Sequence, residues 1–466
     1  MKFGGTSLAD GKGARQALGI ILSYLKKGWE IVVVVSALSQ VTDRLIDASE
    51  AALKRDLASV KGIIQELREK HEKFLDDLFE DPQRRAELSL FVQEKLEELE
   101  KVLVGIGYLG ELTPRSRDYV LSFGERLVAP IVAAALGNLG IKAKAFTGGE
   151  AGIVTDSNFG EARPLMEMTR HQVRNRLEPE LEAGIVPVVT GFIAIDQNGY
   201  LTTLGRGGSD YTATILGASL KADEVWLWTD VDGLMTTDPK VEPSARTIPQ
   251  LSFQEAVEMA ILGAKRMHPR ALEPASEDGI PVRIKNTFRR DLPGTLITRE
   301  AKVRSGSIVK ALTLIKDVAM ITVSGSGMVG TPGTAARIFD VLGRNGINVL
   351  MISQSSSEAN ISFVIPRSLL GKAVTALETT LLGGGLIKNV EAEADVCIIA
   401  AVGAGMKGTP GVAARIFKAV GDEGINVRMI AQGSSELNIS FVVKETDGER
   451  AIRALHEEFR LHEANP

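Results

Sequence analysis

Residues 31–35 read IVVVV, and this run decides the fold class. A continuous β-branched run is typical of a strand that is buried on both faces of a parallel sheet. Two other runs have the same character, IVPVVTGF at 185–192 and DEVWLWTD at 223–230. Helical patterns lie between them, for example VAPIVAAALGNLG at 128–140, which should end at Gly140. Alternating strands and helices predict an α/β fold with a mostly parallel sheet.

The length and composition are those of an ordinary globular protein. The 466 residues leave room for about three domains of roughly 150 residues. A net charge of -5 gives no reason to expect nucleic acid or an anionic membrane as partner. Cys397 is the only cysteine and lies in the apolar run VCIIAAV, so we interpret it as a core residue. We find no apolar run of about 18 to 20 residues and no signal-peptide pattern, so a cytoplasmic protein is expected.

The segment 47–103 differs from its surroundings. It is rich in Glu, Lys, Leu and Ala, with apolar residues at helical spacing. The pattern predicts a helical hairpin or lid that is broken near Asp81 and Pro82. We interpret its charges as a solvated face rather than a binding site.

The C-terminal part contains an internal repeat. Residues 325–364 recur 78 positions later, with 28 of 40 positions identical. Each copy predicts a strand, a glycine loop, a helix with Pro332 or Pro410 in its first turn, a strand, a turn and a strand. Two copies are too few for a solenoid, so we expect paired small α+β domains. The boundary with the α/β region is expected in the turn-rich stretch 291–300.

Both copies contain G-x-G-x-x-G between a strand and a helix, as GSGMVG and GAGMKG. Dinucleotide binding also needs an acidic residue about 20 positions on, at the end of the second strand. These strands end in Gln354 and Gln432 instead. We therefore favour a small anion such as an amino-acid carboxylate as the ligand of this loop, with a simple tight turn as the alternative.

Two loops of the α/β region carry chemistry. In TLGRGGSDYTA, 203–213, glycines allow close backbone approach, Arg206 offers a forked donor for a carboxylate or phosphate, and Ser209 with Asp210 forms a possible helix N-cap. In WTDVDGLMTTDPK, 228–240, three aspartates follow a strand, at the sheet edge where open α/β proteins bind ligands. A structural turn is the alternative for each loop.

Two short segments are less informative alone. KFGGTS at 2–7 is either a phosphate-binding loop or a flexible terminus, and GTSLADGKG at 5–13 lacks the spacing of a P-loop. GAKRMHP at 263–269 places Lys265 and Arg266 before a proline, and His268 is interpreted as structural.

Taken together, these segments resemble one family. KFGGTS, VVVSALSQVTD, SFGERL, GFIA, GRGGSDYTA, WTDVDGLMTTDPK and GAKRMHP occur in the order typical of aspartate kinases, and the repeat resembles the paired ACT domains of that family. The resemblance implies an αβα sandwich of the amino-acid-kinase fold at 1–300, with a helical insertion at about 47–112. It implies two α+β, ferredoxin-like ACT domains at 301–389 and 390–466.

The resemblance also implies an activity. Such an enzyme transfers the γ-phosphoryl group of ATP, carried with Mg²⁺, to the β-carboxylate of L-aspartate, at the start of lysine, threonine and methionine biosynthesis. Alternatives are another member of the family, such as acetylglutamate kinase, or a catalytically inactive amino-acid sensor.

Roles can be carried over position by position. Lys2 and Asp210 are the expected catalytic residues. Glu125 is expected to bind the substrate ammonium and Arg206 its α-carboxylate. The rest of the substrate wall is expected to comprise Ser36, Thr42, Phe192 and Ser209. The expected ATP-binding residues are Lys2, Gly4, Gly5, Thr6, Ser7, Thr229, Asp230, Met235, Lys240 and Lys265. No protein ligand of Mg²⁺ is identified.

The repeat is expected to bind an inhibitory amino acid, lysine or threonine. The candidate contacts lie in 328–333 and the following strand, namely Met328, Gly330, Thr331, Asn348 and Gln354. In the second copy Gln432 is expected to bind, pair or support. We expect a homodimer or homotetramer through the ACT domains.

The two ends of the sequence raise separate expectations. Family members usually have several apolar residues before KFGGTS, so either the start lies upstream of Met1 or the first strand is short. The chain ends after the second repeat, which leaves no room for a fused homoserine dehydrogenase.

Overall fold

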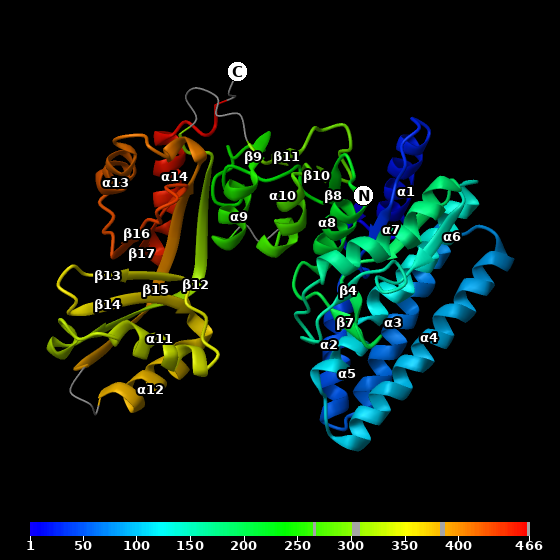
Figure 1. The fold of residues 1–466 in the computed structure, drawn as a ribbon, viewed down its shortest axis with the longest axis horizontal. Helices are drawn as coiled ribbons and strands as arrows, with labels where there is room; N and C mark the ends of the chain where they lie inside the picture. Colours follow the sequence, from blue (N-terminus) through cyan, green and yellow to red (C-terminus); the bar gives the residue numbers. More distant parts are fainter. Residues whose placement is uncertain (264–266, 301–307, 383–386, 464–466) are drawn as a thin grey trace. The chain divides into compact units, whose positions relative to one another are not determined.

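The computed structural model describes residues 1–463 except 264–266, 301–307 and 383–386 (Figure 1). The chain forms two compact units. The first comprises residues 1–234, 249–253 and 266–301. The second comprises 235–248, 254–265 and 302–466, so two segments that precede the repeat in sequence fold with it.

The first unit is built on an eight-stranded sheet in the order β3-β5-β2-β1-β8-β10-β11-β9. Neighbours pair in parallel except β10 and β11. The expected strands are confirmed as β2 (Val33–Val35), β5 (Val186–Thr190) and β8 (Val225–Thr229). The others are β1 (Lys2–Phe3), β3 (Ala143–Phe146), β9 (Gln250–Ser252), β10 (Val282–Asn286) and β11 (Thr295–Thr298). All residues of β2 and β5 are buried, because helices cover both faces of the sheet, as expected for an αβα sandwich.

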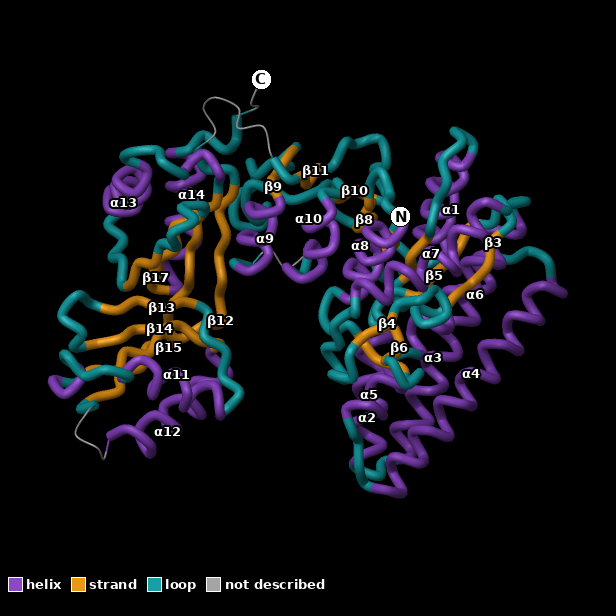
Figure 2. Tube along the Cα trace, viewed as in Figure 1, coloured by secondary structure: helices purple, strands orange, loops and turns teal. Residues whose placement is uncertain are grey.

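Helices surround this sheet (Figure 2). The helix expected at 128–140 is α6 (Phe123–Asn138), which packs on β3 and β5 and ends just before Gly140. The others are α1 (Gly11–Leu25), α2 (Val41–Leu53), α5 (Pro114–Leu121), α7 (Met166–Glu182), α8 (Gly208–Leu220) and α10 (Glu273–Asp278). A smaller sheet contains β4 (Val154–Thr155), β6 (Ile193–Asp196) and β7 (Leu201–Thr203).

The expected helical hairpin is confirmed. It consists of α3 (Leu57–Leu78) and α4 (Pro82–Leu109), which pack along each other (Figure 1). The break falls where predicted, because the Asp81 side chain caps α4 and Pro82 occupies its first turn. Apolar residues of both helices join the core of the unit, while most charged residues are exposed.

The second unit contains the two repeat copies. The first has β12 (Ala311–Ser324), α11 (Thr334–Arg344), β13 (Met351–Gln354), β14 (Asn360–Pro366) and α12 (Leu370–Leu381). The second has β15 (Asn389–Val402), α13 (Val412–Asp422), β16 (Met429–Ala431), β17 (Asn438–Lys444) and α14 (Gly448–Glu458). Their strands form one antiparallel sheet in the order β13-β14-β12-β15-β17-β16.

The strands β12 and β15 are shared between the copies. Each is 14 residues long, and they pair along nearly their whole length. The second half of β12 lies beside β14, while the second half of β15 lies beside β17. Each copy therefore completes its sheet with half a strand from the other.

One detail of the repeat was predicted wrongly. The helices begin at Thr334 and Val412, two residues after Pro332 and Pro410. A glycine in the left-handed region, Gly333 or Gly411, separates proline and helix in each copy, so the prolines belong to the preceding turn.

The helix α9 (Phe253–Ile261) is held to the repeat by a buried carboxylate. Glu255 forms an ion pair with Lys310 at 3.0 Å, and its other oxygen accepts a hydrogen bond from the Ala404 backbone at 2.7 Å. Ala404 belongs to the glycine loop of the second copy. A protein carboxylate therefore already occupies that loop.

Candidate active site

A cavity of about 790 Å³ opens in the first unit at the carboxyl ends of β1 and β2. Nine of the expected site residues line it: Lys2, Gly5, Ser36, Thr42, Glu125, Phe192, Arg206, Ser209 and Asp210. They come from segments far apart in the sequence. The structure therefore brings together the whole expected substrate wall and both expected catalytic residues.

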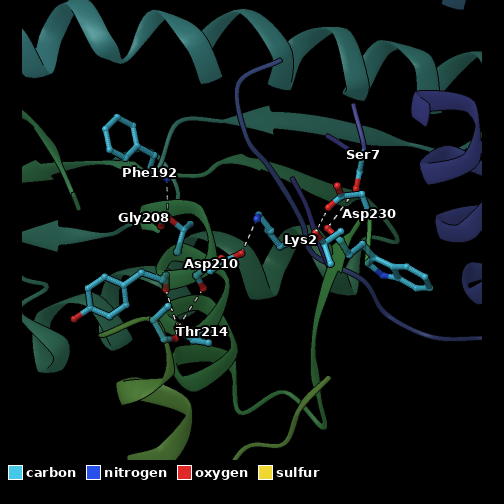
Figure 3. Close-up of polar contacts among 12 residues, drawn as sticks. Lys2, Ser7, Phe192, Gly208, Asp210, Thr214 and Asp230 are labelled. Atoms are coloured by element: carbon cyan, nitrogen blue, oxygen red, sulfur yellow. Dashed lines mark hydrogen bonds and ion pairs between the residues drawn. The ribbon is translucent and has the colours of Figure 1, made fainter. Parts of the chain in front are cut away.

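Lys2 lines this cavity and is held there by Asp210. The Lys2 ammonium lies 2.5 Å from the Asp210 carboxylate, and both side chains are only 12% exposed (Figure 3). β1 has only two residues, but it pairs with β2 on one side and β8 on the other. The short strand therefore holds Lys2 between two buried neighbours, with Asp210 orienting its ammonium.

Glu125 is a buried carboxylate aimed at the same cavity. It lies in the first turn of α6, and one oxygen accepts a hydrogen bond from the Ala37 backbone at 3.1 Å. The other oxygen has no partner among the described residues. Burial raises the pKa of Glu125 to about 8, because the loss of hydration outweighs the backbone hydrogen bonds and the charge of Lys2, which lower it. A buried carboxylate with a free oxygen is suited to bind an ammonium group.

The loop before α8 presents Arg206 to the cavity. Gly205 and Gly207 on either side of it have φ angles of 75° and 74°, which side chains other than glycine rarely adopt. An added Cβ at Gly208 would lie 2.8 Å from the Phe192 ring, so only glycine fits against that wall. Arg206 is exposed, and no described residue accepts a hydrogen bond from it, so its guanidinium is available to an anion.

The expected N-cap at Ser209 and Asp210 is wrong. α8 begins at Gly208 and is preceded by Gly207, so both residues lie inside its first turn. Because Asp210 lies inside the first turn, its carboxylate reaches Lys2. A capping side chain would instead point towards the backbone nitrogens at the start of the helix.

Asp118 on α5 is a cavity residue that the sequence did not reveal. It accepts hydrogen bonds from the backbone nitrogens of Gly160 and Thr203 at 2.9 and 2.8 Å, and from the Thr203 hydroxyl at 2.8 Å. It is 1% exposed, and burial raises its pKa. Asp118 therefore joins three chain segments behind the Arg206 loop. It follows the polar stretch RSR at 115–117, so nothing in the sequence marks it as buried.

The expected nucleotide-side residues are more dispersed. The Ser7 hydroxyl is buried and lies 2.7 Å from that of Thr287, so it does not line the cavity. Thr229 ends β8 and donates a hydrogen bond to Asp230 at 3.0 Å. Gly4 and Thr6 flank Gly5 in the loop after β1. Met235 and Lys240 fold with the second unit, and Lys265 lies outside the described residues.

The expected effector residues lie around the glycine loop of the first copy. Met328 is buried, the Gly330 backbone donates to Glu358 at 2.9 Å, and Thr331 donates to the Gly327 carbonyl at 2.7 Å. Asn348, Gln354 and Gln432 are exposed.

Two further findings concern the described residues. Pro114–Asn138, which contains α5 and α6, is long and apolar enough by length and mean composition to cross a membrane, although Glu125 and Arg126 interrupt its apolar residues. Because 83% of its most apolar 18-residue stretch is buried inside the protein, this segment is part of the core of the fold. The described part of the chain contains no cluster of three or more His, Cys, Asp or Glu side chains that could hold a metal ion.

The sequence models of two families match this chain. That of the amino acid kinase family covers residues 1–286, and that of an ACT domain covers 321–381 and 399–459. The chain belongs to the amino acid kinase family. Its relatives show that it is an aspartokinase-type member with ACT domains, so the resemblance seen in the motifs is confirmed.

Sequence and structure agree on these relatives. The chain is 35% identical to chloroplastic aspartokinase 1 of Arabidopsis thaliana, over 98% of this chain and 79% of that protein. Its fold is similar to E. coli aspartokinase III in complex with aspartate and ADP, with a TM-score of 0.81, 28% identity and 98% coverage of both chains. The complex of that enzyme with lysine and aspartate gives a TM-score of 0.79, again with 28% identity and 98% coverage of both chains.

Proposed function

We propose that this family member phosphorylates the β-carboxylate of L-aspartate with ATP, giving 4-phospho-L-aspartate and ADP. The observation that carries the proposal is the free oxygen of Glu125, which faces the same cavity as Arg206 and Lys2. A buried carboxylate suits an α-ammonium and a guanidinium suits an α-carboxylate. Together they recognise a free amino acid and direct its side chain towards Lys2.

The chemistry needs positioning more than proton transfer. The β-carboxyl group of aspartate has a pKa of about 3.9, so it is already ionised at pH 7 and requires no general base. One of its oxygens attacks the γ-phosphorus of ATP, the bond to the β,γ-bridging oxygen breaks, and ADP leaves. Lys2, oriented by Asp210, and the backbone of Gly4 and Gly5 stabilise the negative charge on the transferring group. Mg²⁺ carried on the ATP phosphates would neutralise further charge.

We further propose that Thr229 and Asp230 contact the nucleotide, with Thr6 and Ser7 supporting the loop after β1. The other expected contacts are not among those proposed, because Met235 and Lys240 fold with the second unit and Lys265 lies outside the described residues. Support comes from the position of β8, whose carboxyl end lies next to that of β1 in the sheet. Loops at this edge are where open α/β sheets bind ligands.

We further propose that the ACT repeats make the enzyme sensitive to an amino acid such as lysine, through Met328, Gly330, Thr331, Asn348 and Gln354. The E. coli relative in complex with lysine supports this class of effector. The second copy is proposed to support rather than bind. Gly330 and Gly408 each donate to a glutamate of their own copy, but the second loop also donates to Glu255 through the Ala404 backbone. The exposed Ile352 and Ile430 on the edge strands β13 and β16 offer surfaces for pairing with a second subunit.

The pathway and location are proposed on the same basis. We propose the first step of lysine, threonine and methionine biosynthesis. Cytoplasmic location stays an expectation, since the Arabidopsis relative is chloroplastic.

The test is trapping of the acyl phosphate with hydroxylamine. The full chain should form a hydroxamate from L-aspartate only when ATP is present. N-acetylglutamate, which lacks a free ammonium group, and UMP should give no ATP turnover. Turnover of either in place of aspartate would reject the proposal in favour of another kinase of this family. Effector binding without any turnover would favour an amino-acid sensor.

A further inference from the structure

We propose a second anion site in the first unit, at a hollow of about 520 Å³ between the outer side of α1 and the segment that follows β10. Its chemistry fits a polyphosphate, and its aromatic wall favours one that carries a base, such as a nucleoside di- or triphosphate. The lining residues that matter are Lys12, Arg15, Gly19, Phe288, Arg289 and Arg290. None of them lines the cavity that holds Glu125.

Four cations meet at this hollow with too few carboxylates to neutralise them. Lys12 has no partner among the described residues. Arg15 donates to the backbone carbonyl of Asp77, whose carboxylate accepts a hydrogen bond from the Gly11 backbone and adds one negative charge beside these cations. Arg289 pairs with Asp232, and Arg290 lies 3.9 Å from Asp291. Four cations against the carboxylates of Asp77, Asp232 and Asp291 therefore leave one positive charge in excess, in a chain whose net charge is -5. Exposed like charges repel one another, and a multivalent anion relieves that repulsion.

Gly19 leaves the floor of the hollow open. It lies in the middle of α1, where glycine costs helix stability relative to alanine. A Cβ added at Gly19 would meet no atom within 4 Å, so packing does not require glycine there. In the same helix, Gly11 and Gly13 are required, because an added Cβ would lie 2.1 Å from Asp77 and 2.6 Å from the Ser7 carbonyl oxygen. The free space at Gly19 leaves room for a ligand on this side of the hollow.

Phe288 gives the hollow an aromatic face. Its side chain is 42% exposed, next to Arg289 and Arg290 in sequence. An exposed ring between cations is suited to stack on a base while the arginines hold the phosphates. This combination favours a nucleotide over inorganic polyphosphate.

The test is isothermal titration calorimetry of the full chain with inorganic tripolyphosphate and, separately, with ADP. We expect Lys12→Ala/Arg290→Ala to lower the affinity for tripolyphosphate about tenfold or more, because two charge-assisted contacts are lost. The matched control is Lys26→Ala/Lys54→Ala, which removes two exposed lysines of the same unit that line neither cavity and should change the affinity less than about twofold. Equal losses in both variants, or none in the first, would overturn the proposal.

Two more variants test the details. Gly19→Leu fills the hollow with a good helix former, so it should reduce binding without unfolding the protein. If Gly19→Leu binds tripolyphosphate as tightly as the wild type does, the ligand does not lie against Gly19. Phe288→Ala should weaken ADP but not tripolyphosphate, and an unchanged ADP affinity rejects the nucleotide assignment. Aspartyl hydroxamate formation by Lys12→Ala/Arg290→Ala should stay within about twofold of wild type, which separates this proposal from the proposed function.

Discussion

Glu125 is the residue on which the proposed substrate recognition depends. Its free oxygen is buried, so an incoming ammonium gains a charge-assisted hydrogen bond in a water-poor setting. The nearby Lys2 ammonium is already paired with Asp210 and is directed elsewhere. In the free protein the ionised carboxylate is therefore costly, and in the proposed complex the substrate ammonium supplies the missing partner.

Replacing Glu125 by glutamine should raise the KM for aspartate about 10- to 100-fold. The reason is the loss of a charged hydrogen bond, about 1.5–3 kcal/mol. Steady-state kinetics in the hydroxamate assay measure it. Glu182→Gln, at an exposed carboxylate that ends α7 and lines neither cavity, is the control and should leave KM unchanged. A wild-type KM for Glu125→Gln would contradict the assigned role.

The pH dependence of binding should follow the same group. Burial raises the pKa of Glu125 to about 8, so at pH 7 the free protein carries it mostly protonated. Only the carboxylate pairs with an ammonium, so aspartate affinity should rise about tenfold per unit between roughly pH 6 and 8 and then level off. Calorimetry in buffers of different ionisation heat should show release of about one proton at pH 7.

The same raised pKa affects folding in the opposite direction: aspartate affinity should rise with pH, while the contribution of Glu125 to folding stability should fall. The raised pKa means that the folded state holds the proton more tightly than the unfolded chain, whose value is 4.5. The stabilisation is complete below that value and is lost as the pH rises through about 8. In Glu125→Gln this loss should disappear. An aspartate affinity that does not change with pH would contradict the assignment.

At the scale of elements, the site depends on how the loop before α8 is fixed. The sequence shows the glycines and Arg206 of this loop, but not Asp118, which fixes it from α5. The contact joins residues 85 positions apart, and a lone aspartate on a helix gives no periodic pattern to detect. The sequence therefore predicted that this loop belongs to the site, and it does line the cavity, while its support by Asp118 was not predictable.

Asp118→Ala should lower both stability and kcat/KM. It leaves three donors without their acceptor, at about 1–3 kcal/mol each when buried. Thermal unfolding and kinetics measure the two effects. Asp118→Asn keeps the size of the side chain and one acceptor oxygen. This variant should therefore retain most of the stability and most of the kcat/KM of the wild type. Full activity in Asp118→Ala would show that the loop does not need this support.

At the scale of the whole molecule, the sequence predicted both folds and their order. This was possible because continuous apolar strands and repeated segments can be recognised in a single amino-acid sequence. It did not predict that 235–248 and 254–265 fold with the repeat, or that β12 and β15 are shared. The first half of β12 precedes the detectable repeat, and its partner, the second half of β15, is nearly 90 residues away. Such pairing depends on the completed sheet rather than on local pattern.

The asymmetry of the two copies gives a matched prediction. Gln354→Ala in the first copy should weaken inhibition by the effector amino acid at least about fivefold. Gln432→Ala, at the equivalent position of the second copy, should change the inhibition less than about twofold. The reason is that Glu255 already accepts a hydrogen bond from the glycine loop of that copy. Inhibition curves with lysine and with threonine measure both. Equal effects from the two variants would contradict a single effector loop per chain.

The most direct test of the central claim is the rate of aspartyl hydroxamate formation by Lys2→Met at saturating ATP and aspartate. Lys2 is the cation that Asp210 holds at the cavity, so its loss removes charge stabilisation from the transferring phosphoryl group. We predict a fall in kcat of about 100-fold or more, with aspartate affinity changed only a few-fold because Glu125 and Arg206 remain. A kcat within about tenfold of wild type would contradict the account.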